Sequence, residues 1–128
     1  MAEKLKKVLV VEDEGPLREV VTANLEENGF IALGAGDGKE GLNVALVEHP
    51  DLILLDIIMP KMDGVAMLKE LRKDDWGKDV PVIMLTNLED SGKVAEATEA
   101  GAYDYLIKID WKLQDVVNKI KEKLGMPR

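Results

Sequence analysis

Apolar residues along the chain fall into two alternating patterns, short continuous runs and sets with helical spacing. The short runs are typical of strands, and they predict strands at residues 7–11, 30–33, 52–55, 80–85 and 104–107. The spaced sets are typical of amphipathic helices, and they predict helices at residues 16–28, 38–48, 65–73, 91–100 and 111–124. Each predicted strand is therefore followed by a predicted helix.

Residues at the ends of these segments support the same boundaries. Pro16 suits the first turn of a helix that Asp13 or Glu14 is placed to cap, and Gly29 suits its end. Pro81 stands near the start of a strand, where a missing amide donor costs least. We expect the apolar sets to face the core: Leu17, Val20, Val21 and Leu25 in the first helix, Leu42, Ala45 and Leu46 in the second, and Leu113, Val116, Val117, Ile120 and Leu124 in the last.

Five strands that alternate with five helices predict an α/β fold, a doubly wound parallel sheet with helices on both faces. The continuous apolar run at 52–55 agrees, because strands of such sheets are buried on both sides. We expect the flavodoxin-like strand order 2-1-3-4-5. The chain has 128 residues and neither an internal repeat nor a linker, so we expect one domain over residues 1–128, with its core at about 6–124.

Composition narrows the class of protein. Hydrophobic residues make up 46% of the chain and charged residues 33%, which is typical of a soluble globular domain. The absence of cysteine excludes disulfides and thiol chemistry, and it fits a cytoplasmic location. The net charge of −8 argues against direct nucleic-acid binding. No apolar segment approaches the roughly 20 residues that span a bilayer, so we expect neither nucleic acid nor membrane as a partner.

Polar residues with chemical potential stand where the predicted strands end. Glu12 and Asp13 follow the first strand, Asp56 the third, Thr86 the fourth and Lys108 the fifth. Ligands of open parallel sheets bind beyond the carboxyl ends of the strands, so these side chains are expected to converge. Three carboxylates brought together repel one another unless a cation offsets their charge. Mg²⁺, which prefers oxygen ligands, is the natural counter-ion.

This arrangement suits phosphoryl chemistry. A carboxylate such as Asp56 can attack phosphorus and form an aspartyl phosphate. The phosphoryl oxygens would then need a metal, an ammonium group and a hydroxyl donor, of which Lys108 and Thr86 supply the last two. Taken singly, each of these residues is more often a turn, a helix cap or a solvated side chain. Their joint placement at successive strand ends favours the functional interpretation.

Four stretches of the chain resemble the motifs of response-regulator receiver domains, such as chemotaxis regulators. The stretch at 10–14 is similar to the acid-pair motif, and the stretch at 54–64, which contains Asp56, is similar to the phosphoacceptor motif. The stretches at 81–86 and 100–108 are similar to the segments that carry the switch threonine, the switch aromatic residue and the site lysine. The resemblance covers nearly the whole chain in the right order.

The resemblance implies a role in two-component phosphorelay signalling. Asp56 would accept a phosphoryl group from the phosphohistidine of a sensor histidine kinase or a phosphotransfer protein. Asp13, Asp56 and the backbone carbonyl of Ile58 would bind Mg²⁺ directly, while Glu12 would act through water. Lys108 would pair with the phosphoryl group. The chain would not be an enzyme in the usual sense, although it would assist its own phosphotransfer and dephosphorylation.

The resemblance also implies how the signal leaves the site. Thr86 would move toward the phosphoryl group, and Tyr105 would turn into the space that Thr86 leaves. The face formed by the fourth helix, fifth strand and fifth helix would change, and it would bind a downstream protein target or an output domain. No output domain follows Arg128, so we expect either a stand-alone regulator or a domain taken from a longer protein.

Some residues depart from the family pattern and keep two alternatives open. Ile109 stands where the family usually has proline, and Asn87 stands where it often has alanine. One alternative is a pseudo-receiver, an interaction module of the same fold that works without phosphorylation. The other is a small enzyme or flavin carrier of flavodoxin type, which would need a phosphate-cradling loop after the first strand, where Glu12 and Asp13 stand instead and would repel a phosphate without a metal. A dinucleotide site at 34–38 is disfavoured separately, because that segment lacks the glycine spacing. Apolar Ile58 and Leu88 would shield the phosphoryl group from water, which predicts slow self-dephosphorylation.

Overall fold

The computed structural model describes the chain except for residues 1–4, 58, 60, 87–90, 102–103, 108–111 and 127–128. Strands and helices alternate along it, as the sequence predicts. The strands are β1 (Lys7–Val11), β2 (Ile31–Ala35), β3 (Leu52–Asp56), β4 (Val82–Thr86) and β5 (Asp104–Ile107). The helices are α1 (Gly15–Glu27), α2 (Gly38–Glu48), α3 (Gly64–Leu71), α4 (Ser91–Glu99) and α5 (Leu113–Lys123).

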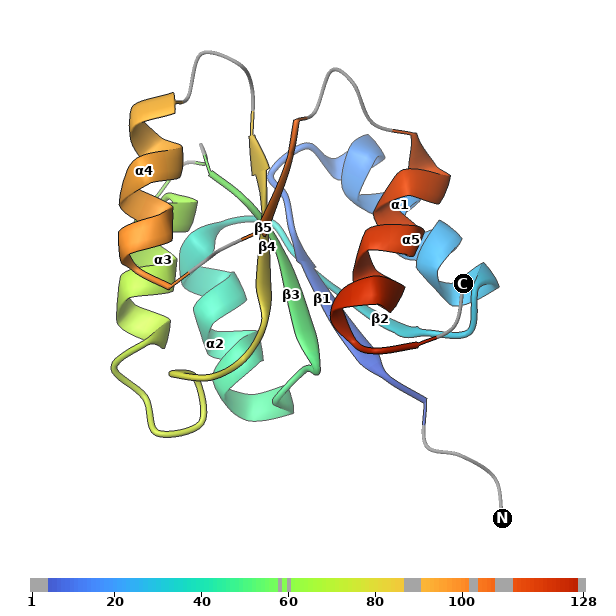
Figure 1. Ribbon diagram of the computed structural model, residues 1–128, viewed down its shortest axis with the longest axis horizontal. Coiled ribbons are helices and arrows are strands. Elements are labelled where there is room, and N and C mark those ends of the chain that lie inside the picture. The colour runs from blue at the N-terminus through green and yellow to red at the C-terminus, as the bar shows by residue number, and fades with distance from the viewer. Residues whose placement is uncertain are drawn as a thin grey trace.

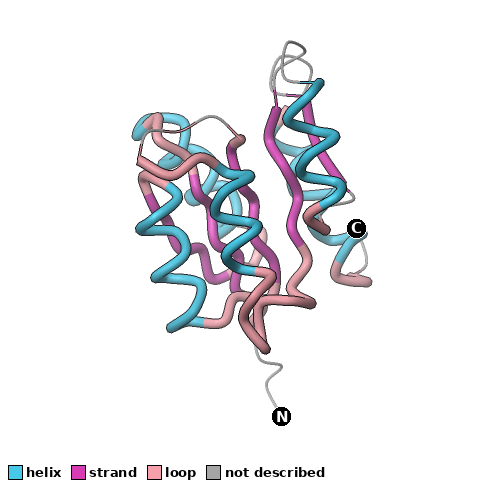
Figure 2. The backbone as a smooth tube through the Cα atoms, turned by 90° about the vertical axis from the view of Figure 1, so that its left-hand side faces the viewer, coloured by secondary structure: helices cyan, strands magenta, loops and turns pink. Residues whose placement is uncertain are grey.

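The strands form one parallel sheet in the order β2-β1-β3-β4-β5. The predicted α/β class and the order 2-1-3-4 are thereby confirmed, and β5 pairs with β4 at the far edge. Helices α1 and α5 lie on one face of the sheet, and α2, α3 and α4 lie on the other (Figure 1). Figure 2, turned by 90°, shows the strands in magenta and the helices that pack against them in cyan.

Alternate residues of the buried strands pack into two separate hydrophobic clusters. On β1, Leu9 and Val11 belong to the cluster beneath α2 and α3, whereas Val8 and Val10 belong to the cluster beneath α1 and α5. All four side chains have no exposed surface. Successive strand residues point to opposite faces, so a sheet covered on both sides requires an unbroken apolar run, which is the pattern seen in the sequence.

Several sequence predictions about the helices are wrong in detail. Val20 is 50% exposed and Leu46 is 37% exposed, so neither belongs to the core. Glu14 occupies the N-cap position of α1, but its side chain accepts no capping hydrogen bond. Helical spacing defines a face only approximately, and the width of the buried stripe depends on the elements that pack against it.

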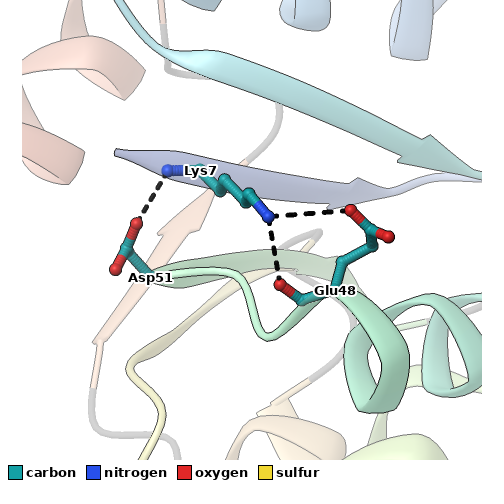
Figure 3. A network of polar contacts seen from close by, with 3 residues as sticks. All are labelled: Lys7, Glu48 and Asp51. Atoms are coloured by element: carbon teal, nitrogen blue, oxygen red, sulfur yellow. Dashed lines mark hydrogen bonds and ion pairs between the residues drawn. The ribbon is translucent and has the colours of Figure 1, made fainter. Parts of the chain in front are cut away.

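Polar contacts fasten the amino ends of β1 and β3 to the end of α2 (Figure 3). The backbone N–H of Lys7 donates to Asp51 Oδ2 at 2.8 Å, and the Asp51 N–H donates back to the Lys7 carbonyl at 2.8 Å. The Lys7 ammonium lies 3.7 Å from Glu48 Oε1. These contacts lie at the opposite edge of the sheet from the acidic residues that follow β1 and end β3.

No helix in the described part of the chain is long and apolar enough to cross a membrane.

Candidate functional site

Three carboxylates meet at the carboxyl edge of the sheet, as the sequence predicts. Val11 of β1 pairs with Leu55 of β3, so the next residues along the two strands, Glu12 and Asp56, lie level with each other. Glu12, Asp13 and Asp56 can each offer a carboxylate oxygen, and these oxygens lie within 4.8 Å of one another. Neighbouring parallel strands that both end in acids therefore create the cluster.

The three acids differ in their exposure to water. Glu12 has no exposed surface and Asp56 is only 4% exposed, and these are the buried charged residues of the described chain. Asp13 is exposed and forms the outer side of the cluster. Burying carboxylates together is costly, because each loses hydration and repels the others. Such a cluster is therefore expected to favour a bound cation.

Hydrogen bonds fix the backbone of Glu12 on both sides. Its N–H donates to the Ala35 carbonyl of β2 at 3.0 Å. Its carbonyl accepts from Arg18 Nη1 at 2.7 Å, and its Oε2 accepts from the Glu14 N–H at 3.2 Å. The sequence analysis missed Arg18, because a residue of a helix that contacts a strand end is not visible in the linear pattern.

Close backbone contacts support the segment between β3 and α3. The Ile57 N–H donates to the Leu85 carbonyl at 3.2 Å, and the Gly64 N–H donates to the Ile57 carbonyl at 2.8 Å. Asp63 caps α3, since its Oδ1 accepts from the Ala66 N–H at 2.8 Å. These bonds hold the chain on both sides of the turn that follows Asp56.

The donor set fits a hard divalent cation. It consists of carboxylate oxygens from two neighbouring strand ends, without nitrogen or sulfur. Mg²⁺ takes one or two protein carboxylates and keeps several waters. The exposed Asp13 leaves the outer side of the cluster open to solvent and to an incoming group, so the three acids are suitable ligands for Mg²⁺.

The structure describes only some of the remaining predicted site residues. The backbone of Thr86 ends β4 and pairs with Ile107, while Tyr105 pairs with Met84 inside β5. Thr86 follows Leu85, which pairs with Asp56, so its backbone lies at the same edge as the acids. Lys108, Ile58, Asn87, Leu88 and Ile109 lie outside the described residues, and their roles stay predictions.

Two features that the sequence analysis set aside have structural explanations. The rings of His49 and Trp76 stack with centroids 4.3 Å apart and an interplanar angle of 7°. They join the end of α2 to the connection before β4, away from the acids. Gly34 and Gly36 form no nucleotide-binding loop; the side chain of Arg18 lies against both.

A parallel sheet with three acids at its carboxyl edge defines a class of flavodoxin-like domains with an oxygen-ligand cation site. Within that class, the family model of the response regulator receiver domain matches residues 8–121. The chain therefore belongs to the response regulator receiver domain family and is a receiver domain of two-component signalling. Nothing in the comparisons favours the pseudo-receiver alternative.

Relatives of known sequence agree with this assignment. The chain is 43% identical over 106 residues to a probable transcriptional regulator ycf27 of Guillardia theta, covering 83% of this chain and 41% of the relative. It is 38% identical over 116 residues to the phosphate regulon transcriptional regulatory protein PhoB of Escherichia coli K12, covering 91% and 50%. The chain thus spans about half the length of these relatives.

Solved structures also support the fold and the cation site. The receiver domain of the sensor histidine kinase PA1611 from Pseudomonas aeruginosa PAO1 superposes with a TM-score of 0.86. It is 29% identical, and the match covers 95% of this chain and 99% of that domain. That structure has a magnesium ion coordinated in the active site cleft. The family binds Mg²⁺, and the acids of this chain form a cluster suited to the same ion.

Proposed function

We propose that the chain is a phosphorylation switch in which Asp56 accepts a phosphoryl group from a phosphohistidine. The observation that supports this most directly is the placement of Asp56, 4% exposed, beside Glu12 and Asp13 at the end of a buried strand. Its backbone is held by pairing with β4, so the carboxylate starts from a fixed position within the acid cluster. A nucleophile held in this way loses little entropy when it reacts.

The proposed step is a phosphoryl transfer. A carboxylate oxygen of Asp56 forms the new P–O bond, while the P–N bond of the donor histidine breaks. The leaving imidazole nitrogen keeps the electron pair and takes up a proton. In self-dephosphorylation a water oxygen forms the new P–O bond and gives up a proton, while the P–O bond to Asp56 breaks. The Asp56 oxygen keeps the electron pair, so inorganic phosphate is released and the carboxylate is restored.

The other predicted residues would divide the work of stabilising charge. Bound Mg²⁺ would neutralise charge on the phosphoryl oxygens as they pass to Asp56. Asp13, Asp56 and the Ile58 carbonyl would hold it directly, with Glu12 acting through water. Lys108 would pair with a phosphoryl oxygen.

Thr86 and Tyr105 would transmit the phosphorylation signal to a partner-binding surface. Thr86, at the end of β4, would donate its hydroxyl to the new phosphoryl group, and Tyr105 on the adjacent β5 would turn inward. The added charge of about −1.5 to −2 supplies the bias for such a change. The face of α4, β5 and α5 is proposed to bind the downstream target or an output domain.

The partners follow from the same proposal. The donor would be a sensor histidine kinase or a phosphotransfer protein. The named relatives are transcriptional regulators about twice as long, and the regulation of transcription is a property of those proteins. For this chain we propose a single receiver domain over residues 1–128 without direct nucleic-acid contact, which its net charge of −8 supports.

Intact mass after incubation with acetyl phosphate and Mg²⁺ tests the proposal. The parent should gain one phosphoryl group, Asp56→Asn should gain none, and removal of Mg²⁺ with EDTA should prevent the gain. Asp75→Asn, which changes an exposed aspartate between α3 and β4, is the matched control and should behave like the parent. A parent that binds Mg²⁺ but is phosphorylated neither by acetyl phosphate nor by a histidine kinase would contradict the proposal.

A further inference from the structure

The side chain of Arg18 lies against β2 at Gly34 and Gly36 and reaches the backbone of Glu12. Arg18 belongs to α1, and its Nη1 donates to the backbone carbonyl of Glu12 at 2.7 Å in a partly buried contact. A hydrogen bond from a charged guanidinium is stronger than a neutral one. Arg18 therefore contacts the strand end that carries the acids, although it is not itself a member of the acid cluster.

The contact falls on the peptide group that joins Glu12 to Asp13. The Glu12 carbonyl belongs to the same planar unit as the Asp13 N–H, so fixing that oxygen fixes the direction in which the chain enters Asp13. On the other side of Glu12, its N–H is held by Ala35 at 3.0 Å. Asp13 is the exposed acid, and it has the most freedom to turn away from a cation.

Two glycines make room for Arg18. A Cβ added at Gly34 would lie 3.3 Å from Arg18 Cδ, and one added at Gly36 would lie 3.3 Å from Arg18 Nη1. Both distances are tighter than ordinary van der Waals contact. The lack of a Cβ at Gly34 and Gly36 thus leaves space for the arginine side chain, while the Ala35 carbonyl between the glycines accepts from the Glu12 N–H.

We propose that Arg18 is a positioning residue, which orients the Glu12–Asp13 peptide so that Asp13 and Glu12 can serve a divalent cation together. The inference rests on the proposed function, because it assigns Arg18 a part in the Mg²⁺ site used for phosphorylation of Asp56. Residues that orient metal ligands from outside the ligand set typically contribute about 10–100-fold to metal affinity.

The test compares Arg18→Met, which keeps the apolar stem over Gly34 but removes the donor, with Arg18→Lys, which keeps the charge. Mg²⁺ affinity is measured by calorimetry, and the rate of phosphorylation by acetyl phosphate is measured against Mg²⁺ concentration. We expect Arg18→Met to weaken Mg²⁺ binding by about tenfold and Arg18→Lys to weaken it less. At saturating Mg²⁺ the maximal rate should stay within about twofold of the parent, because only positioning is lost. Glu19→Gln, an exposed charge change on the next residue, should match the parent.

A second variant separates positioning from general damage to the fold. Gly36→Ala pushes on Nη1 without removing the guanidinium, so it should weaken Mg²⁺ binding by about two- to threefold in the parent and not at all in Arg18→Met. The inference is overturned if Arg18→Met binds Mg²⁺ like the parent. It is also overturned if the maximal rate and thermal stability fall together without relief in Arg18→Lys. A parent that binds no Mg²⁺ would refute the proposed site itself, and the role of Arg18 would fall with it.

Discussion

Gly64, the first residue of α3, lies directly against the backbone of Asp56. A Cβ built on Gly64 would collide with the carbonyl oxygen of Asp56 and would lie 3.0 Å from Ile57 Cα. The residue that follows the β3–α3 turn therefore has to be glycine if the turn is to close over the end of β3. Because these neighbours are backbone atoms, a side chain here cannot be accommodated by a change of rotamer.

Gly64→Ala should therefore displace the end of β3 and damage the site. Overpacking of this kind costs about 1–3 kcal/mol, and the movement of Asp56 should also lower Mg²⁺ affinity and the rate of phosphorylation. Urea unfolding and Mg²⁺ calorimetry measure the two effects. Gly92→Ala in α4 is the control, since a Cβ there meets nothing within 4 Å and alanine favours a helix. Parent-like Mg²⁺ binding in Gly64→Ala would disprove the expected coupling.

Removal of one acid from the cluster should stabilise the protein without metal and abolish its response to metal. Asp13 shares a space with two buried acids, so Asp13→Asn removes repulsion in the metal-free state. In EDTA, the melting temperature of Asp13→Asn should therefore be higher than that of the parent. The parent should gain stability with Mg²⁺, by about 2.7 kcal/mol at 100 times its Kd, and Asp13→Asn should gain almost none.

The neighbouring Glu14→Gln tests whether this effect belongs to the cluster. Glu14 is exposed, and its side chain forms no cap on α1. Its replacement should leave the Mg²⁺-dependent gain in melting temperature intact. Equal behaviour of Asp13→Asn and Glu14→Gln would mean that net charge, and not the cluster, governs the response.

The sequence predicts those features of the structure that depend on the local pattern of apolar and acidic residues. The apolar runs located β1 and β5 with the bounds that the structure has, and the position of acids at the ends of β1 and β3 was enough to predict the cluster. Both depend on regularities of parallel sheets, namely burial on two faces and convergence of the carboxyl ends.

What the sequence could not supply depends on contacts between distant segments. Val20 has the spacing of a core residue, yet half of its surface stays exposed. The contact of Arg18 with Glu12 requires α1, the end of β1 and two glycines at β2 to come together. No single stretch of the chain contains that information, so the sequence alone gives no sign that this helical arginine contacts the strand end that carries the acids.

Ionised Asp37 should stabilise the protein near neutral pH, and this contribution should be lost in acid. It caps α2, and the backbone hydrogen bond from Glu40, with help from Lys61, lowers its pKa below the ordinary value of 3.8. A carboxyl whose pKa is lowered in the folded state stabilises above its unfolded pKa, and that contribution is lost as the pH falls through the folded pKa. Asp37→Asn keeps a capping oxygen but lacks the charge.

Melting temperatures measured from neutral pH to about pH 3 check the effect. The parent should be more stable than Asp37→Asn near neutral pH, and the difference should shrink below the ordinary pKa of 3.8. Asp37→Ala, which removes the cap as well, should be the least stable of the three near neutral pH. A constant difference between parent and Asp37→Asn over the whole range would show that the charge of Asp37 contributes nothing.

The aspartyl phosphate should be long-lived. Ile58 and Leu88 stand two residues beyond Asp56 and Thr86, and both are apolar. Apolar groups near a phosphoryl group exclude the water that would hydrolyse it. Decay of the phosphorylated mass after removal of acetyl phosphate should take minutes or longer, and Ile58→Asn should accelerate it. A parent half-life on the scale of seconds would rule out this shielding.

Arg72 should be important for stability and unimportant for the site. At the end of α3 its Nη1 donates to the carbonyls of Gly77 and Val80 at 2.7 and 2.8 Å, and its Nη2 donates to Gly101 at 2.8 Å. One guanidinium thus joins the connection before β4 to the turn after α4. Arg72→Met would leave these partly buried carbonyls without their donor, so the free energy of unfolding should fall by roughly 2–4 kcal/mol.

The location of Arg72 makes the same variant a control for the site variants. Its acceptors flank the start of β4, at the edge of the sheet opposite to the acids. Mg²⁺ affinity of the folded Arg72→Met protein should therefore equal that of the parent, whereas Gly64→Ala and Arg18→Met should bind more weakly. Loss of Mg²⁺ affinity in all three variants would mean that the site senses global stability. Loss of Mg²⁺ affinity in Gly64→Ala and Arg18→Met alone would show that Mg²⁺ binding depends on the backbone around the acids.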